Sequence, residues 1–173
     1  VDYWFEEDRQ DAENKPLKDD ERLSISLDKL RDFISLFSDH VRFYYGHDPH
    51  NKSLNFIGAA KYIFGKRKVF TKQIQKIRHH LKESELPSNT RETFKDGEGI
   101  YVQIPKCNFD VEIAVDAIRL KDTYDTLALF SSDADFISLV RYLRKNGKKI
   151  IIFKGGHITS DLRREVDKVI NAQ

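Results

Sequence analysis

The 173-residue sequence predicts an α/β fold with a mostly parallel central sheet and helices on both faces. Three observations support this prediction. Short apolar runs rich in β-forming residues alternate with stretches of helical periodicity along the chain. Such alternation is typical of parallel sheets, because a crossover helix must return the chain to the same end of the sheet. The length fits one domain over residues 1–173, with a hydrophobic core of its own.

In the N-terminal half, the sequence predicts strands and helices of ordinary length. Ser26 suits the N-cap of a helix that carries Leu27, Leu30, Ile34 and Phe37 on one face. The run 41–45 alternates too little for a half-exposed strand and suits a buried one, closed by Gly46. The predicted elements are the end of a strand at 1–5, the helix after Ser26, the strand 41–45, and helices at 56–64 and 71–81.

The C-terminal half opens with a predicted β-hairpin insertion at residues 92–104. Asp96-Gly97 marks its turn, and Ile100, Val102 and Ile104 alternate behind it. Strand and helix then alternate to the end of the chain. The predicted elements are a helix capped by Asn108 and running to about Leu120, a strand at 126–130, a helix at 136–145 ended by Asn146-Gly147, a strand at 149–153, and a helix capped by Ser160 and running to Ile170.

Composition narrows the class of protein. The single cysteine, Cys107, excludes an internal disulfide framework and suits a reducing compartment. No apolar run reaches transmembrane length and no signal-peptide pattern opens the chain, so we expect a cytoplasmic protein without a membrane partner. Because the sequence begins with Val1 rather than methionine, we expect the native N-terminus to extend further.

Basic residues cluster between positions 61 and 82, although the formal net charge is only +2. The window holds eight lysines and arginines and no acid. Such a cluster suits a phosphate backbone, while a solvated helix face would look the same. The candidate RNA-binding residues are Lys61, Lys66, Arg67, Lys68, Lys72, Lys76, Arg78 and Lys82.

Acidic residues gather where predicted strands end. Asp133 and Asp135 follow the strand 126–130, and ligands of open parallel sheets bind at the carboxyl ends of the strands. Asp110 lies in the first turn of its helix, and Asp2 ends the first predicted strand. Taken alone, Asp110, Asp133 and Asp135 would each also suit a helix N-terminus, where carboxylates cap the backbone and complement the dipole. As a set of oxygen ligands, the four predict a Mg²⁺ or Mn²⁺ site.

Three motifs then carry a family resemblance. They are the segment Phe109-Asp110-Val111-Glu112-Ile113-Ala114-Val115-Asp116-Ala117-Ile118, the strand end Leu129-Phe130-Ser131-Ser132-Asp133-Ala134-Asp135-Phe136, and the helix-glycine-strand unit at 138–153, followed by Ser160-Asp161-Leu162-Arg163. In this order and spacing they resemble the NYN domain, a LabA-like branch of the PIN-like nuclease superfamily. The resemblance covers residues 100–170 well and the N-terminal half loosely.

The resemblance implies a Rossmann-like PIN-type fold and metal-dependent hydrolysis of RNA. By motif, Asp110, Asp133 and Asp135 carry over as metal-site and catalytic acids, with Asp2 as a fourth and Asp116 in support. Ser131 and Ser132 could orient water or phosphate and Lys106 could contact a phosphate, although serines at such junctions are usually caps and such lysines are usually solvated.

Three functions remain open from the sequence. The first is a Mg²⁺- or Mn²⁺-dependent ribonuclease, with RNA as partner. The second is a catalytically inactive NYN-type module that binds RNA or protein, which Phe5 favours because the family pattern has asparagine there. The third is a phosphohydrolase of small esters, which would not need eight cations. The sequence leaves the oligomeric state open, a homodimer included.

Overall fold

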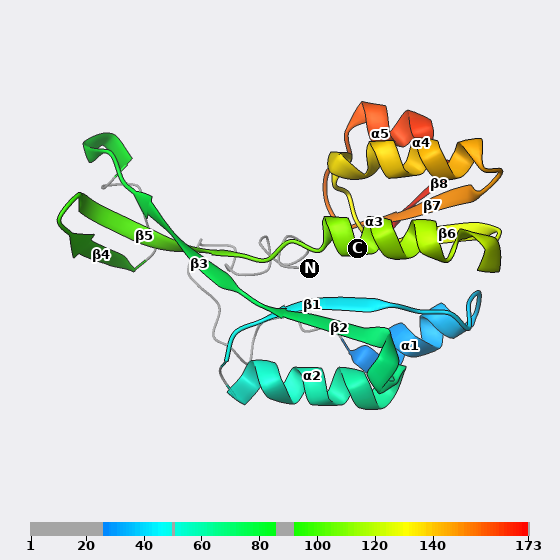
Figure 1. Ribbon diagram of the computed structural model, residues 1–173, viewed down its shortest axis with the longest axis horizontal. Coiled ribbons are helices and arrows are strands. Elements are labelled where there is room, and N and C mark those ends of the chain that lie inside the picture. Colours follow the sequence, from blue (N-terminus) through cyan, green and yellow to red (C-terminus); the bar gives the residue numbers. More distant parts are fainter. Residues whose placement is uncertain (1–25, 50, 86–91, 173) are drawn as a thin grey trace, which may run out of the picture. The chain divides into compact units, whose positions relative to one another are not determined.

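The computed structural model describes residues 26–49, 51–85 and 92–172. The described chain divides into two compact units, an N-terminal unit up to Asn108 and a C-terminal unit from Phe109 onward. Figure 1 colours the first from blue to green and the second from green to red. The predicted strand end at 1–5, with Asp2, lies outside the described residues.

The C-terminal unit is a run of alternating helices and strands. Its three strands are parallel and lie in the order β6-β7-β8 (Figure 1). In the register, Leu129 lies beside Ile152 and Ile152 beside Val169. The elements are α3 (Asp110–Arg119), β6 (Thr126–Leu129), α4 (Ile137–Lys145), β7 (Lys149–Lys154), α5 (Ser160–Glu165) and β8 (Lys168–Asn171), with 3₁₀ turns η5 (Lys121–Thr123) and η6 (Ala134–Phe136).

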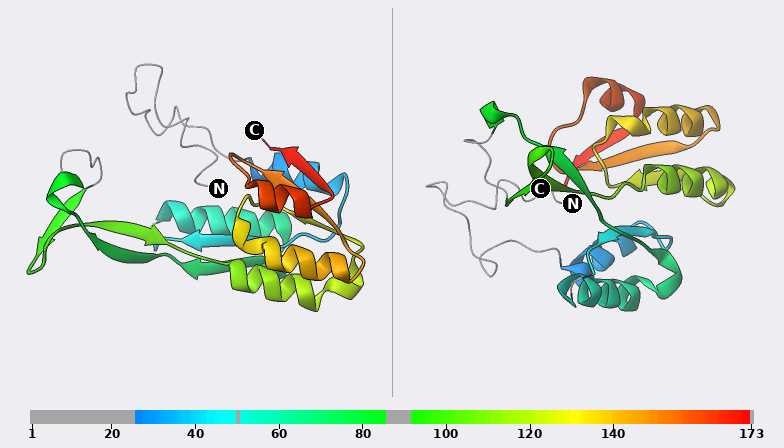
Figure 2. Two further views of the ribbon diagram at one scale, coloured as in Figure 1. Left: turned by 90° about the horizontal axis from the view of Figure 1, so that it is seen from above. Right: turned by 60° about the vertical axis from the view of Figure 1, so that its left-hand side comes forward.

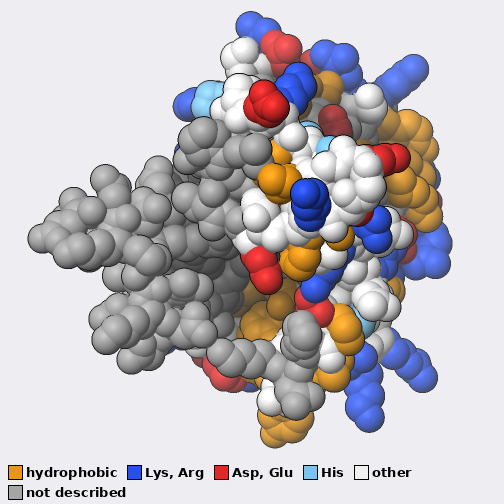
Figure 3. Space-filling view, turned by 90° about the vertical axis from the view of Figure 1, so that its left-hand side faces the viewer, with side chains coloured by type: hydrophobic (Ala, Val, Ile, Leu, Met, Phe, Trp, Pro, Cys, Tyr) orange, Lys and Arg blue, Asp and Glu red, His pale blue; other side chains and the backbone are white. Residues whose placement is uncertain are grey.

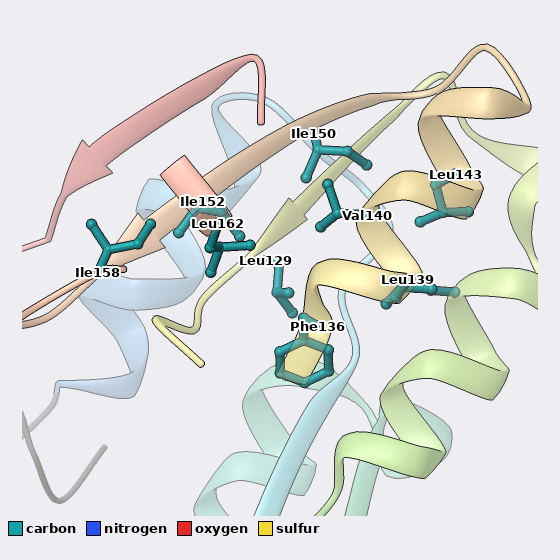
Figure 4. Close-up of a cluster of buried hydrophobic side chains, with 10 residues drawn as sticks. Leu129, Phe136, Leu139, Val140, Leu143, Ile150, Ile152, Ile158 and Leu162 are labelled. Atoms are coloured by element: carbon teal, nitrogen blue, oxygen red, sulfur yellow. The ribbon is translucent and has the colours of Figure 1, made fainter. Parts of the chain in front are cut away.

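One hydrophobic cluster holds this unit together. Side chains from all three helices pack with Leu129, Ile150 and Ile152 of the sheet (Figure 4). Each fully buried aliphatic side chain contributes about 1.5–3 kcal/mol relative to exposure. The most deeply buried members are Leu143, Ile150, Ile152, Leu162 and Val140. This cluster fixes the ends of α3 and η6, where the acidic residues lie.

The N-terminal unit contains a parallel pair and an antiparallel sheet. Strands β1 and β2 are parallel, and the antiparallel sheet has the order β3-β5-β4. Two views show β3 and β5 as a long ribbon (Figures 1 and 2). The elements are α1 (Leu27–Ser35), β1 (Phe43–His47), α2 (Asn51–Phe64), η3 (Lys66–Lys68), β2 (Val69–Gln73), β3 (Gln75–His80), η4 (Glu83–Glu85), β4 (Thr93–Asp96) and β5 (Gly99–Lys106).

The α/β class and most predicted elements are confirmed. Ser26 caps α1, since its hydroxyl accepts from the backbone N–H of Lys29 at 3.4 Å. The hairpin is β4-β5, with Asp96 opposite Gly99 across the turn. Gly147 follows α4 with φ of 76°, as a helix stop requires. The sheet is only partly as predicted, because the β3-β5-β4 sheet is antiparallel.

The predicted helix at 71–81 is wrong. Its spacing of Ile74, Ile77 and Leu81 looks helical, but the segment forms the end of β2 and all of β3. Pairing decides the outcome: β2 lies along β1, and β3 forms a six-residue ladder with β5. Tertiary pairing of this kind overrides a weak local preference.

Two caps and one helix end also differ from the prediction. The N-cap of α3 is Phe109 rather than Asn108, and it makes no side-chain cap bond. The N-cap of α5 is Thr159 rather than Ser160, and its hydroxyl accepts from the N–H of Leu162 at 3.4 Å. The helix ends at Glu165 instead of Ile170, because residues 168–171 form β8 beside β7. No described helix has the length and apolar character needed to cross a membrane.

Candidate metal centre

Three of the predicted acids come from two neighbouring elements of the C-terminal unit. Asp110 is the first residue of α3. Asp133 is the N-cap of η6, and Asp135 lies inside that turn. Because α3 and η6 contact each other, the start of the helix and the turn after β6 meet at one place.

The loop from β6 to η6 is held by an aromatic side chain at each end. Phe130 stacks on Phe153, with ring centroids 4.4 Å apart and planes inclined by 5°. At the other end, Phe136 is buried in the hydrophobic cluster. The polar residues between them therefore have a fixed entry and exit.

Hydrogen bonds inside this loop set the directions of its acids. The hydroxyl of Ser131 accepts from the backbone N–H of Asp133 at 3.1 Å. Oδ1 of Asp133 accepts from the backbone N–H of Asp135 at 2.9 Å. Asp133 thus caps the turn with one oxygen, as carboxylates at helix N-termini often do, and its other oxygen can bind another partner.

The three carboxylates form a compact cluster. One carboxylate oxygen from each of Asp110, Asp133 and Asp135 lies within 4.8 Å of the others. Asp110 is half-buried, and the other two are exposed. Oxygens bound to one Mg²⁺ at about 2.0–2.1 Å in an octahedron are roughly 3–4 Å apart. Small side-chain rotations would bring this set to that spacing.

Like charges at this spacing repel one another. Two carboxylates 4.8 Å apart repel by about 1 kcal/mol even in the dielectric of water. In the described part of the chain, no lysine or arginine forms an ion pair with Asp133 or Asp135. A divalent cation would offset the repulsion, and the all-oxygen donor set favours Mg²⁺ or Mn²⁺ over zinc.

The hydroxyl of Ser132 is a second unusual feature of this loop. Its oxygen is buried, and among the described residues it has no hydrogen-bond partner. Leaving a buried hydroxyl unpaired costs about 1–3 kcal/mol. Ser132 adjoins Asp133 in the chain, so this cost falls beside the acidic cluster.

The other predicted supporting residues lie outside the cluster. Asp116 is buried, with 9% of the residue exposed. Its carboxylate accepts a hydrogen bond from the Arg119 guanidinium at 2.7 Å. Lys106 is the last residue of β5 and is exposed. Lys106 belongs to the N-terminal unit, whereas the cluster belongs to the C-terminal unit.

The predicted RNA-binding residues are spread over several elements instead of one helix. Lys61 is in α2, Lys66, Arg67 and Lys68 form η3, and Lys72 is in β2. Lys76 and Arg78 are in β3, and Lys82 follows that strand. On the face shown in Figure 3, lysines and arginines lie among acidic, hydrophobic and other side chains.

Several of these cations have partners within the N-terminal unit. The Nζ of Lys68 donates to the carbonyl of Asp39 and the Nζ of Lys72 to that of Asn108, both at 3.1 Å. Lys76 lies 3.6 Å from a carboxylate oxygen of Asp48.

Sequence reasoning missed one polar cluster on the hairpin. Asp96 binds Nε2 of His80 at 3.0 Å and lies 3.3 Å from the Arg78 guanidinium, which sits over the Tyr101 ring at 5.1 Å. The hydrogen bond from His80, and next that from the backbone N–H of Glu98, lower the pKa of Asp96 below its ordinary value. The sequence predicted the Asp96-Gly97 turn of the hairpin, but it did not indicate that His80 and Arg78 contact Asp96.

Comparisons with known proteins agree with the family resemblance of the sequence motifs. The NYN domain model matches residues 10–173. The low amplitude and bright protein LabA of Synechococcus elongatus is 33% identical over 67 residues, which are 38% of this chain and 36% of LabA. An uncharacterized protein of Methanocaldococcus jannaschii is 39% identical over 57 residues, 32% of this chain and 24% of that protein. The matched segments thus span about a third and a quarter of these relatives.

One solved structure is similar along most of the chain. It is a protein of unknown function from Vibrio parahaemolyticus, with a TM-score of 0.58 and 18% sequence identity. The match covers 87% of this chain and 80% of that one. At this identity the likeness concerns the fold alone.

Proposed function

The chain belongs to the NYN domain family, and on that premise we propose that it is a Mg²⁺- or Mn²⁺-dependent ribonuclease. The family as a whole is nuclease-like, which supports a hydrolase. The observation that carries the proposal is the cluster of Asp110, Asp133 and Asp135, whose carboxylate oxygens lie within 4.8 Å of one another.

In this proposal the three carboxylates hold one divalent cation. The cation supplies Lewis-acid activation of a water molecule and stabilises charge on the scissile phosphate. Oδ1 of Asp133 caps η6 by accepting from the backbone N–H of Asp135, and the other oxygen of this carboxylate would be a ligand of the cation. Ser131 supports Asp133 by accepting from its backbone N–H. Asp2 completes the set of acids in the proposal.

The other residues of the proposal act on orientation and on RNA. Ser132 provides a hydroxyl beside Asp133 that has no hydrogen-bond partner among the described residues, and Asp116 supports α3 through Arg119. Lys106 contacts a phosphate in this scheme. The RNA backbone is held by the basic residues from Lys61 to Lys82, because release of counterions from phosphates favours binding.

The finer description of the fold belongs to the same proposal. We assign a Rossmann-like PIN-type fold in a single domain of residues 1–173. The parallel β6-β7-β8 sheet with its alternating helices supports the first part. The family match, which runs through both compact units, supports the second.

Cleavage of end-labelled RNA tests this function. Wild type should cut the RNA with Mn²⁺ and not with EDTA. Asp133→Asn should lose at least about 100-fold in rate, because the lost electrostatic stabilisation is of that order. Asp125→Asn is the matched control: Asp125 is exposed, and the described residues offer it no ion pair.

The outcomes separate the three functions. Metal-dependent cutting that Asp133→Asn abolishes and Asp125→Asn preserves supports the proposal. RNA that is retained but uncut in Mn²⁺ indicates the inactive binding module instead. Turnover of a small phosphate ester without affinity for RNA indicates the phosphohydrolase.

A further inference from the structure

The antiparallel β3-β5-β4 sheet has two faces with different charge. Residues opposite each other in the ladder share a face, and alternate residues along a strand point to opposite faces. The register therefore divides the sheet into two sets. The Arg78 face carries Lys76, Arg78, His80, Phe94, Asp96, Tyr101, Gln103 and Pro105, and the Lys95 face carries Gln75, Ile77, His79, Thr93, Lys95, Ile100, Val102, Ile104 and Lys106.

The cations of the Arg78 face are matched by acids. Lys76 pairs with Asp48, and both Arg78 and His80 pair with Asp96. The rings of His80 and Phe94 and the guanidinium of Arg78 also gather around Tyr101. This face is thus largely occupied by its own contacts.

Among the described residues, no acid compensates the positive charge of the Lys95 face. This face contains no aspartate or glutamate. Lys95, Lys106 and His79 are exposed, and none of them forms an ion pair with any residue that the structure describes. Apolar residues lie between them: Ile77 is 44% exposed, whereas Val102, on the central strand, is buried with 3% exposed.

These polar groups are spread along the ribbon. Lys95 lies opposite Ile100, His79 opposite Val102 and Lys106 opposite Gln75. The six steps from Ile100 to Lys106 span about 20 Å at the rise of a β-strand. A row of donors on that scale suits an extended chain of phosphates better than one compact anion.

We propose that the Lys95 face of the β3-β5-β4 sheet is a binding surface for the backbone of single-stranded RNA, with Lys95 and Lys106 as phosphate contacts and His79 as a hydrogen-bond donor between them. The inference rests on the proposed function and specifies where on the N-terminal unit the RNA lies. It adds Lys95 and His79 to the candidate residues and gives Lys76 and Arg78 a smaller part.

Binding of a fluorescein-labelled oligouridine, followed by anisotropy in EDTA so that the RNA stays intact, tests the proposal. The double variant Lys95→Gln/Lys106→Gln should bind about tenfold more weakly at 0.1 M salt. Its plot of log affinity against log salt should be shallower by about 1.4, since each phosphate contact contributes roughly 0.7 for single strands.

The control removes the same charge elsewhere. Lys145→Gln/Lys168→Gln changes two exposed lysines of the C-terminal unit that have no ion pair within the described chain, and it should bind as wild type does. Lys76→Gln/Arg78→Gln should lose less affinity than the Lys95 and Lys106 double variant. Unchanged melting temperatures show that the variants fold.

Two failures are distinguishable. Wild type that binds oligouridine while Lys95→Gln/Lys106→Gln binds it equally well overturns the assignment of this face and leaves the ribonuclease proposal standing. Wild type that does not bind oligouridine overturns the assignment of this face as well, and cleavage of end-labelled RNA in Mn²⁺ then decides the ribonuclease proposal separately.

Discussion

At the scale of single residues, the candidate site combines local roles with a collective one. Asp133 caps η6, and Asp110 and Asp135 lie in the first turns of their elements, where acids favour the local dipole. None of these roles requires that three carboxylates lie within 4.8 Å. The clustering therefore has a cost that local structure does not explain, and a bound cation would remove it.

This cost gives a stability prediction. In EDTA, Asp133→Asn should melt at a higher temperature than wild type, because asparagine keeps the oxygen that accepts from Asp135 N–H and removes one charge from the cluster. In Mn²⁺ the order should reverse, because only wild type gains from binding the ion. Differential scanning calorimetry measures both. Asp125→Asn should follow wild type in each buffer. Wild type melting at or above Asp133→Asn in EDTA would argue against repulsion in the cluster, and an order that stays the same in Mn²⁺ would argue against binding of the ion.

Asp96 gives a prediction about pH. Its pKa is lowered in the folded protein, first by the hydrogen bond from His80. A lowered folded pKa means stability that is present above the unfolded value near 4 and is lost as the pH falls through the lower folded value.

The test is Asp96→Asn, which keeps the oxygen that accepts from Glu98 N–H in the turn. Wild type should exceed the variant in urea midpoint at pH 6, and the difference should shrink below pH 4. A difference that grows on acidification would contradict the assignment.

At the scale of elements, the sequence predicted structure correctly where the backbone conformation of a turn or helix end requires particular residues. The Asp96-Gly97 turn predicted the β4-β5 hairpin, because such turns match the twist of the strands. Asn146-Gly147 predicted the end of α4, because glycine tolerates a φ of 76°. The acidic cluster could be predicted for the same reason: Asp133 caps η6, and Asp110 and Asp135 lie in the first turns of α3 and η6.

The predictions of secondary structure were wrong where pairing with segments distant in sequence determines the structure. The spacing of Ile74 and Ile77 favoured a helix, but their segment gains a ladder with β5, which is distant in sequence. Likewise, residues 168–171 join β7, where Val169 lies beside the fully buried Ile152. The ion pair of Lys76 with Asp48 also joins residues distant in sequence, so the charge pattern alone could not show which cations remain without an acidic partner.

Two glycines test the element-scale reasoning. Gly147→Ala should lower the free energy of unfolding by about 1 kcal/mol, because its φ of 76° strains any residue with a Cβ. Gly58→Ala, in the exposed part of α2, should raise it by about 0.5–1 kcal/mol. A Cβ meets no atom within 4 Å at either position. Urea unfolding of both variants should therefore show opposite signs, and equal signs would refute the conformational explanation.

At the scale of the whole molecule, the two compact units contribute different chemistry. The acidic cluster comes entirely from the C-terminal unit, and the proposed RNA-binding residues come entirely from the N-terminal unit. The family match spans both. The division explains why the proposal needs two kinds of test, one for the cation and one for the RNA.

The most direct test of the central claim is calorimetric titration of the metal-free protein with Mn²⁺. Wild type and Asp125→Asn should bind the ion with the same stoichiometry and affinity, and Asp133→Asn should lose at least about tenfold in affinity, since a charged ligand is removed from the set. Asp110→Asn should show the same loss from the other element of the site. Binding of Mn²⁺ by Asp133→Asn and Asp110→Asn with wild-type affinity would contradict the claim that these carboxylates form a metal centre.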